Sequence, residues 1–510
     1  MPVNSQNNQR IAKNTMLLYI RMLILMFVNL YTSRVILKAL GIEDYGIYNA
    51  VGGFVAMFGM ISTALGGAIS RYLTFSLAKD TPERLREIFS TSIIIQFALC
   101  VLLITIAETL GIWFINTQMD MPADRIVAAN WVFQISVLTT IINLIGIPYQ
   151  SLIIAHERMS TFAYIGIYEG VFNLSIAIIL SYVVSFDALI TYAILLCALA
   201  VSVRAIYGVY CSKNFPESSF KFIIDKELLK NMFSFAGWNF IGTTSGVLRS
   251  QGINVLINIF CGPAVNAARG IAMQVNGALS GFTGNFMTAV RPQITKSYAL
   301  GNKDAYENLV FKSSKFSFFI LLIIFLPLII ESKFIISAWL VEVPEYTIEF
   351  VQVILILTLV ESYSHPLIYL LLSTGNIKKY QILVGVIQIL NFPIAYVLLK
   401  LGLSPISTVT SAIFIAIICL FTRLWLLKNM INFPVKTFTT NVILRTAVLF
   451  IVNWGLFMII KDVIAFEGWT QFIINVISIE TICITLIYIF GLTKSEKYFI
   501  LSIIKKIIKR

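Results

Sequence analysis

Charged residues are scarce in this sequence. Only 12% of its 510 residues are Asp, Glu, Lys or Arg, while 58% are hydrophobic, and the mean hydropathy is +0.86. A soluble domain carries roughly 25% charged residues. The shortage argues against an ordinary soluble protein. Because a helix needs roughly 20 apolar residues to cross a bilayer core, and such runs recur along the whole chain, the composition predicts an integral membrane protein.

Histidines are few, and the cysteines are not arranged in pairs. The sequence has two histidines, His156 and His365, far apart, and six cysteines without a CxxC pair. These residues form no metal-ligand spacing, and the nucleotide-binding, metalloprotease and serine-hydrolase motifs do not occur. The sequence therefore predicts no metal, no cofactor and no enzymatic activity.

Long apolar runs dominate what is present. A β-barrel would show alternating segments of about 10 residues instead. Polar clusters and Gly/Pro signals divide the chain into fourteen expected spans. They are 12–38, 43–78, 83–112, 123–153, 160–184, 187–212, 227–259, 263–298, 304–330, 346–373, 378–400, 404–428, 440–460 and 469–491. The predicted fold class is an all-α polytopic membrane protein.

The net charge of +13 follows from the expected topology. With both termini in the cytoplasm, 29 of the 38 Lys and Arg residues fall on cytoplasmic segments or span ends. Cytoplasmic loops of membrane proteins carry such an excess. The bias predicts a multi-pass protein of the bacterial cytoplasmic membrane with both termini inside, and it removes the need for a nucleic-acid partner.

The sequence repeats weakly at a spacing near 220. Arg71 matches Arg291, Pro148 matches Pro366 and Asn173 matches Asn391. Two parallel six-helix repeats are predicted, of the kind that place a substrate site between halves near the bilayer midplane. The expected domains are an N-terminal lobe (1–212), a cytoplasmic linker (213–226), a C-terminal lobe (227–430), two further spans (431–493) and a basic amphipathic tail (494–510).

Arginines inside the apolar spans are the most informative residues. Arg21, Arg249 and Arg269 lie within spans, and Arg34 ends the first span. A charge at a helix centre costs about 2.5–3.5 kcal/mol and usually faces a cavity or a partner. Guanidinium groups bind phosphate bidentately, so the pattern favours an anionic substrate. The alternative, left open here, is that Arg21 and Arg249 pair with the deep acids Glu169 or Glu361.

A resemblance rests on two segments, "RVILKALGIEDYGIYNAVGGF" (34–54) and "GGAISRYLTFSLAKD" (66–80). They resemble the polysaccharide transporters, in particular Wzx-type O-antigen flippases, of the multidrug/oligosaccharidyl-lipid/polysaccharide exporter superfamily. The resemblance implies two six-helix lobes in the V-shaped arrangement of the multidrug (MATE) and lipid II (MurJ) exporters, plus two C-terminal helices. It also implies a flippase for lipid-linked oligosaccharide, used in lipopolysaccharide or other surface-polysaccharide synthesis.

On that resemblance, we expect undecaprenyl-pyrophosphate-linked oligosaccharide as the substrate, with membrane lipids and the polysaccharide polymerase machinery as further partners. The four arginines would hold the pyrophosphate in a central cavity that opens to alternate sides. Expected sugar contacts are Tyr19, Asn49, Trp238, Asn239 and Gln274; Glu169 and Glu361 are the candidates for ion coupling. The alternatives are a cation or drug antiporter on the same fold and a membrane-embedded glycan polymerase or ligase.

Overall fold

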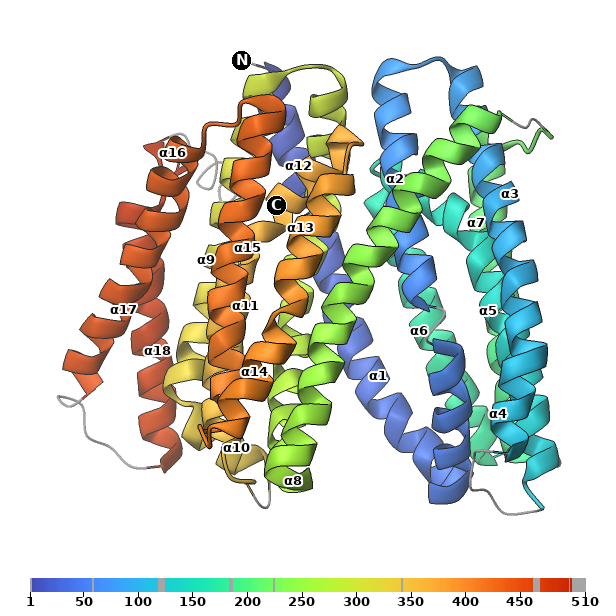
Figure 1. Cartoon of the computed structure of the whole chain (residues 1–510), viewed down its shortest axis with the longest axis horizontal. Coiled ribbons are helices and arrows are strands. Elements are labelled where there is room, and N and C mark those ends of the chain that lie inside the picture. Colours follow the sequence, from blue (N-terminus) through green and yellow to red (C-terminus); the bar gives the residue numbers. More distant parts are fainter. Residues whose placement is uncertain are drawn as a thin grey trace. The chain divides into compact units, whose positions relative to one another are not determined.

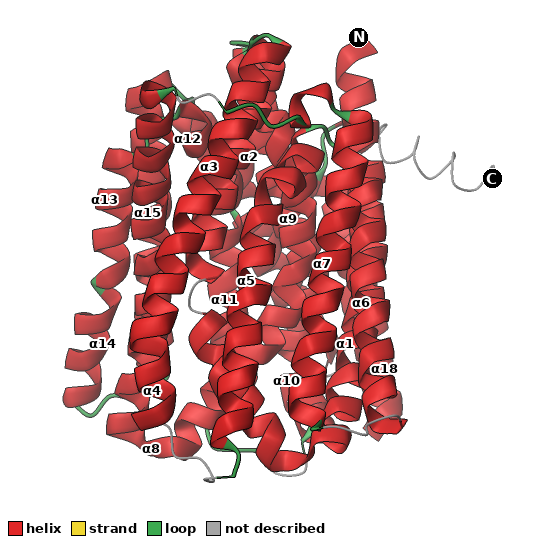
Figure 2. Cartoon of the chain, turned by 90° about the vertical axis from the view of Figure 1, so that its right-hand side faces the viewer, coloured by secondary structure: helices red, strands yellow, loops and turns green. Residues whose placement is uncertain are grey.

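The computed structural model of the protein describes residues 2–56, 59–117, 124–182, 187–222, 225–340, 343–461, 468–494 and 496–497. In this part of the chain the regular structure is entirely helical, as Figure 2 shows. Most of the predicted tail, at 495 and 498–510, lies outside the described residues.

The described chain forms two compact units. Unit 1 comprises Met1–Thr244, Thr288–Lys303 and Leu372–Gln381; unit 2 comprises Ser245–Met287, Asp304–Leu371 and Ile382–Arg510. Unit 1 therefore combines the first half of the chain with two short segments of the second half. The five domains expected from the sequence stay a prediction.

Unit 1 is built mainly from the helices of the first half, labelled in Figure 1. They are α1 (Pro2–Ala56), α2 (Gly59–Lys79), α3 (Pro82–Ile106), α4 (Ile112–Thr117), α5 (Ile126–Ala155), α6 (Met159–Tyr182) and α7 (Ala188–Asn214), with the π-helical turn η1 (Ala107–Gly111) and the 3-10 turn η2 (Pro216–Ser218). Within the unit, α1 packs against α6, and α5 packs against both α7 and α2. Buried apolar side chains such as Leu73, Phe89 and Phe133 fill the space between them.

The second half begins with the long helix α8 (Lys226–Ala299), which contributes to both units. The other helices are α9 (Lys303–Ile330), α10 (Ser332–Trp339), α11 (Thr347–Ser362), α12 (Ser364–Thr374), α13 (Lys378–Ile389), α14 (Asn391–Lys400), α15 (Ser407–Ile431), α16 (Val435–Phe438), α17 (Arg445–Lys461) and α18 (Gly468–Leu486), with the π-helical turns η3 (Thr439–Leu444) and η4 (Ile487–Gly491). In unit 2, α15 packs against α11 and α14, and α17 packs against α18.

Two glycines break the longest helices in the same way. Gly41 interrupts α1 with φ 78° and ψ 172°, and Gly262 interrupts α8 with φ 84° and ψ 174°. This backbone region is open essentially to glycine alone, because a Cβ would clash there. The two residues are 221 positions apart, which matches the spacing of the sequence repeat. The duplication therefore extends to a specific backbone conformation.

Ten of the described helical stretches are long and apolar enough to cross a membrane, so the chain is a multi-pass membrane protein. The predicted spans 12–38, 43–78, 227–259 and 263–298 fall in α1, α2 and α8, which are not among the ten. The count of fourteen spans stays a prediction.

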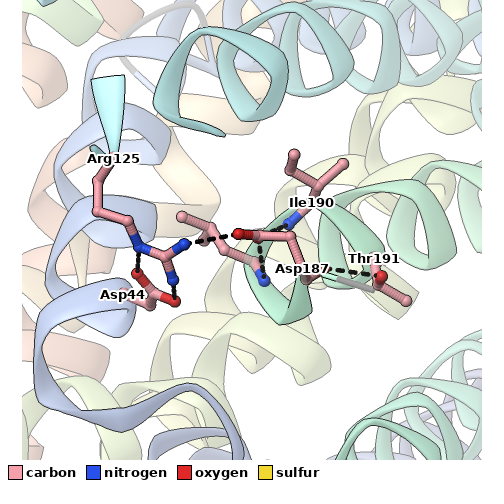
Figure 3. A network of polar contacts seen from close by, with 6 residues as sticks. Asp44, Arg125, Asp187, Ile190 and Thr191 are labelled. Atoms are coloured by element: carbon pink, nitrogen blue, oxygen red, sulfur yellow. Dashed lines mark hydrogen bonds and ion pairs between the residues drawn. The ribbon is translucent and has the colours of Figure 1, made fainter. Parts of the chain in front are cut away.

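An arginine joins three helices at one end of unit 1, as shown in Figure 3. Arg125, directly before α5, donates from Nε to Asp44 of α1 at 2.8 Å and from Nη1 to Asp187 at 2.6 Å. The Asp187 side chain also caps α7 by accepting from the backbone N–H groups of Leu189 and Ile190. One cation therefore fixes the starts of α5 and α7 against α1.

Candidate functional site

Arg21 lies half-buried on α1 within unit 1. Its guanidinium stacks over the ring of Phe162 on α6, 4.5 Å from the centroid. A Cβ at Gly166, one turn further along α6, would overlap the guanidinium, so the glycine makes room for it. Among the described residues, the buried Nε of Arg21 has no hydrogen-bond partner, although Glu169 interacts electrostatically with the guanidinium. The arginine keeps donor capacity for an anion.

A second half-buried arginine, Arg204 of α7, lies in the same unit. The positive-inside rule takes it as a residue at a cytoplasmic span end. Its Nη2 donates to Asn143 of α5 at 2.8 Å, and its side chain occupies space that a Cβ at Gly146 would fill. Glu169 is close enough to interact electrostatically with both Arg21 and Arg204. The repeat spacing indicates this residue, since Arg423 lies 219 positions later and is buried.

In unit 2, Arg249 and Glu361 form an ion pair at 3.1 Å between α8 and α11. This is one of the glutamate pairings that the sequence left open for Arg249. Arg269, also on α8, is 6% exposed, donates to the side chain of Asn254 and is electrostatically coupled to Arg249. Within the described chain its buried Nε has no hydrogen-bond partner. Arg269 thus resembles Arg21 in holding unused donor capacity inside a helical unit.

The other predicted residues are distributed over both units. Tyr19 is half-buried on α1, Glu169 is exposed on α6 and Gln274 is exposed on α8. Trp238 lies under the ammonium group of Lys378, 5.2 Å from its ring centroid. Asn239 accepts from Gln381 at 3.3 Å. The side chains of Arg34 and Asn49 lie outside the described part of the chain.

A cluster that the sequence did not indicate surrounds Glu157, in the turn between α5 and α6. Its carboxylate accepts from Lys296 at 2.6 Å and from the side-chain amide of Gln293, both on α8. The carboxylate-bearing side chain is 8% exposed. Glu157 adopts a left-handed conformation, φ 59°, which is costly for a non-glycine residue. Its counterpart in the repeat, 218 positions later, is Gly375, with φ 80°.

The turn at Gly375 is held in a related way. Arg71, in the middle of α2, donates to the backbone carbonyl of Ser373 at 3.1 Å, and its guanidinium faces the ring of Phe235. Arg291 donates to the backbone carbonyl of Gly67 on α2 at 2.7 Å. We name the contacts around Glu157, Arg71 and Arg291 the latch. Within unit 1, the latch ties α2 and the α5–α6 turn to the two segments 288–303 and 372–381.

Comparisons with known proteins identify a family and a fold. The sequence profile described as "polysaccharide biosynthesis protein" matches residues 11–298. A search of curated protein sequences gives no match.

Solved structures of transporters share the fold of this chain. One, described as a multidrug resistance MATE family transporter of the MOP superfamily in an outward-facing conformation, superposes with a TM-score of 0.70 at 13% identity, covering 82% of this chain and 95% of that one. A MATE crystal structure in the bent conformation gives a TM-score of 0.71 at 14% identity, with coverages of 82% and 94%. A MOP superfamily transporter from Pyrococcus furiosus gives 0.67 at 13% identity, covering 84% and 96%; it is described as having a binding pocket of reverse polarity that suggests a different function.

Proposed function

Because the chain belongs to the polysaccharide biosynthesis protein family, among the polysaccharide transporters of the MOP superfamily, we propose that it flips a lipid-linked oligosaccharide across the bacterial cytoplasmic membrane. The proposed substrate is an undecaprenyl-pyrophosphate-linked oligosaccharide destined for O-antigen, lipopolysaccharide or another surface polysaccharide. Membrane lipids and the polysaccharide polymerase machinery are its proposed partners. Both termini are proposed to lie in the cytoplasm.

The observation that carries the proposal is the presence of buried guanidinium groups with unused donors. Arg21 and Arg269 each have a buried Nε without a hydrogen-bond partner among the described residues. Leaving such a donor unsatisfied costs about 1–3 kcal/mol or more for a charged group, so a bound oxyanion would recover that cost. The Pyrococcus furiosus transporter is described as having a binding pocket of reverse polarity, so the polarity of the pocket differs among proteins of this fold.

In this proposal a guanidinium group holds the pyrophosphate, with Arg21 of unit 1 and Arg269 of unit 2 as the candidates, while the polyprenyl tail stays in lipid. Arg249 already forms an ion pair with Glu361, so its charge is compensated and it does not supply a free cation for the pyrophosphate. Alternating access then requires that the latch open at one face. Its basic residues, Arg71, Arg291 and Lys296, support a cytoplasmic position for that face, since cytoplasmic segments carry an excess of Lys and Arg. With an interior-negative potential, exporting each negative charge gains about 2.3 kcal/mol per 100 mV.

The test is a flipping assay in proteoliposomes containing undecaprenyl-pyrophosphate oligosaccharide. We expect Arg21→Ala and Arg269→Ala to slow flipping about tenfold or more, since each removes a charged hydrogen bond worth about 1.5–3 kcal/mol. The lysine variants should recover part of the rate, because they keep the charge but lose bidentate geometry. Arg158→Ala, an exposed site, is the control.

Normal flipping by both alanine variants would contradict the assigned roles. Failure of the wild-type protein to flip any glycan tried, together with tight binding of lipophilic cations, would favour the cation or drug antiporter instead. The sugar-contact roles of Tyr19, Trp238, Asn239 and Gln274 can be tested in the same assay as changes in KM. The same assay is applied to variants at the remaining candidates, which are Asn49, Arg34 and the ion-coupling residues Glu169 and Glu361.

A further inference from the structure

A cavity of about 330 Å³ opens in unit 2, away from Arg249 and Arg269. It lies where α9, the π-helical turn η3 and the residues after η4 meet. Its lining includes Lys312, Lys315 and Arg445, together with the carboxylate of Glu496. The volume falls within the range of ligand sites, roughly 300–1,000 Å³. Two amides and a hydroxyl complete the polar lining; they belong to Asn308, Asn441 and Thr493.

The charge balance of the cavity favours an anion. Glu496 is engaged, since its Oε2 accepts from Lys315 Nζ at 2.7 Å and from the backbone N–H of Thr493 at 2.7 Å. Arg445 uses only Nε to reach the carbonyl of Phe490, at 2.6 Å, and a guanidinium has five N–H donors. With three cations and one paired carboxylate, the lining has an excess of positive charge. Guanidinium and ammonium groups donate charge-assisted hydrogen bonds to phosphate oxygens.

The position of the cavity points to a lipid as the source of that phosphate. The lining residues of the cavity come from the first half of α9, from the chain around the start of α17 and from the residues after η4. Because successive spans alternate in direction, these three regions lie at the same membrane face. The positive-inside rule assigns this face to the cytoplasm. Exposed apolar side chains of η3 and α17, Leu444 and Val448, lie next to the lining residue Arg445 in sequence, and Phe490 of η4 is also exposed. A headgroup in the cavity could therefore keep its acyl chains against these helices.

We propose that this cavity, lined by Lys312, Lys315 and Arg445, binds the phosphate-bearing headgroup of an anionic phospholipid of the surrounding bilayer. The site is separate from the proposed transport site and does not depend on it. Its binding interactions are charge-assisted hydrogen bonds from the basic groups and neutral ones from the amides.

The test uses the purified full chain in detergent, titrated with phosphatidylglycerol and, for comparison, phosphatidylcholine, with bound lipid counted by native mass spectrometry. We expect Lys312→Ala to weaken phosphatidylglycerol binding about tenfold, because it removes one charged contact. Lys312→Arg should retain binding. Lys428→Ala makes the same change of charge at an exposed residue outside the cavity and should leave binding within about twofold of wild type.

Inorganic phosphate in the same titration separates the two sources of the anion. The lipid should bind while millimolar phosphate fails to displace it. Equal phosphatidylglycerol binding by wild type and Lys312→Ala, or equal loss in Lys312→Ala and Lys428→Ala, would overturn the site. Displacement of the lipid by inorganic phosphate at similar concentration would overturn its identity as a lipid site.

Discussion

The contact between Glu157 and Lys296 in the latch allows a quantitative prediction. The carboxylate accepts a charged hydrogen bond from Lys296 at 2.6 Å and a second hydrogen bond from Gln293, in surroundings that leave the glutamate side chain 8% exposed. A hydrogen bond to a charged group contributes about 1.5–3 kcal/mol. Glu157→Gln keeps the shape and removes the charge. We therefore expect it to favour opening of the latch by about this amount, or roughly ten- to a hundredfold in the opening equilibrium.

Amide hydrogen exchange of the 288–303 segment in nanodiscs is the assay, because local opening controls exchange there. Glu157→Gln and Lys296→Met should each speed exchange, and the double variant should exchange little faster than either single one. The double-mutant cycle isolates the pairwise energy. Arg158→Gln, at the exposed neighbouring position, is the matched control and should leave the segment unchanged.

A change of less than about twofold in Glu157→Gln, or strictly additive effects of the two substitutions, would refute the latch, since contacting residues should couple by more than about 0.5 kcal/mol. Faster exchange in Arg158→Gln as well would show that any charge change at this turn has the same effect.

Three further predictions concern backbone strain at Gly262 and the buried ion pair of Lys315 with Glu496. Gly262→Ala should destabilise the protein by about 1–3 kcal/mol because φ is 84° there, whereas Gly277→Ala, at a helical glycine with open space around it, should stabilise slightly; thermal unfolding in detergent compares them. Lys315→Met should cost about 3–5 kcal/mol, since Glu496 would remain buried without its cation. Burial opposes ionisation of Glu496, but hydrogen bonds from Lys315 and the Thr493 backbone outweigh it and lower the pKa of Glu496 below its usual range. A lowered folded-state pKa gives stability that is present above the unfolded value, near 4.3, and lost as pH falls through the folded one. Thermal stability should therefore decline in acid in the wild type and less so in Glu496→Gln; equal acid sensitivity in both would refute the assignment.

The helical membrane fold, the internal repeat and the family resemblance depend on local sequence pattern. The helical membrane fold followed from apolar runs and scarce charge, because a bilayer admits only backbones that satisfy their own hydrogen bonds. The repeat near 220 was visible in Arg71 and Arg291, and the structure extends it to Gly41 and Gly262. The family resemblance, drawn from residues 34–80, is confirmed by the profile match.

The partners of the buried arginines could not be read in the same way. A guanidinium in an apolar run satisfies the same pattern whether it pairs with a glutamate or faces a cavity. The sequence kept both options for Arg249, and only the packing of α8 against α11 puts Glu361 beside it. Arg204 looked like a helix-end charge, yet it is held inside unit 1 by Asn143 and the space at Gly146.

The sequence by itself therefore determined the membrane environment, the helical secondary structure and the internal repeat of this protein. These features depend on composition and on short-range backbone chemistry. Tertiary structure alone decided which charges meet. Glu157 lies 139 residues from Lys296 along the chain, and their contact at 2.6 Å depends on how an α5–α6 turn approaches the end of α8. Charge pairing acts over a few ångströms in space, and no one-dimensional pattern encodes that distance.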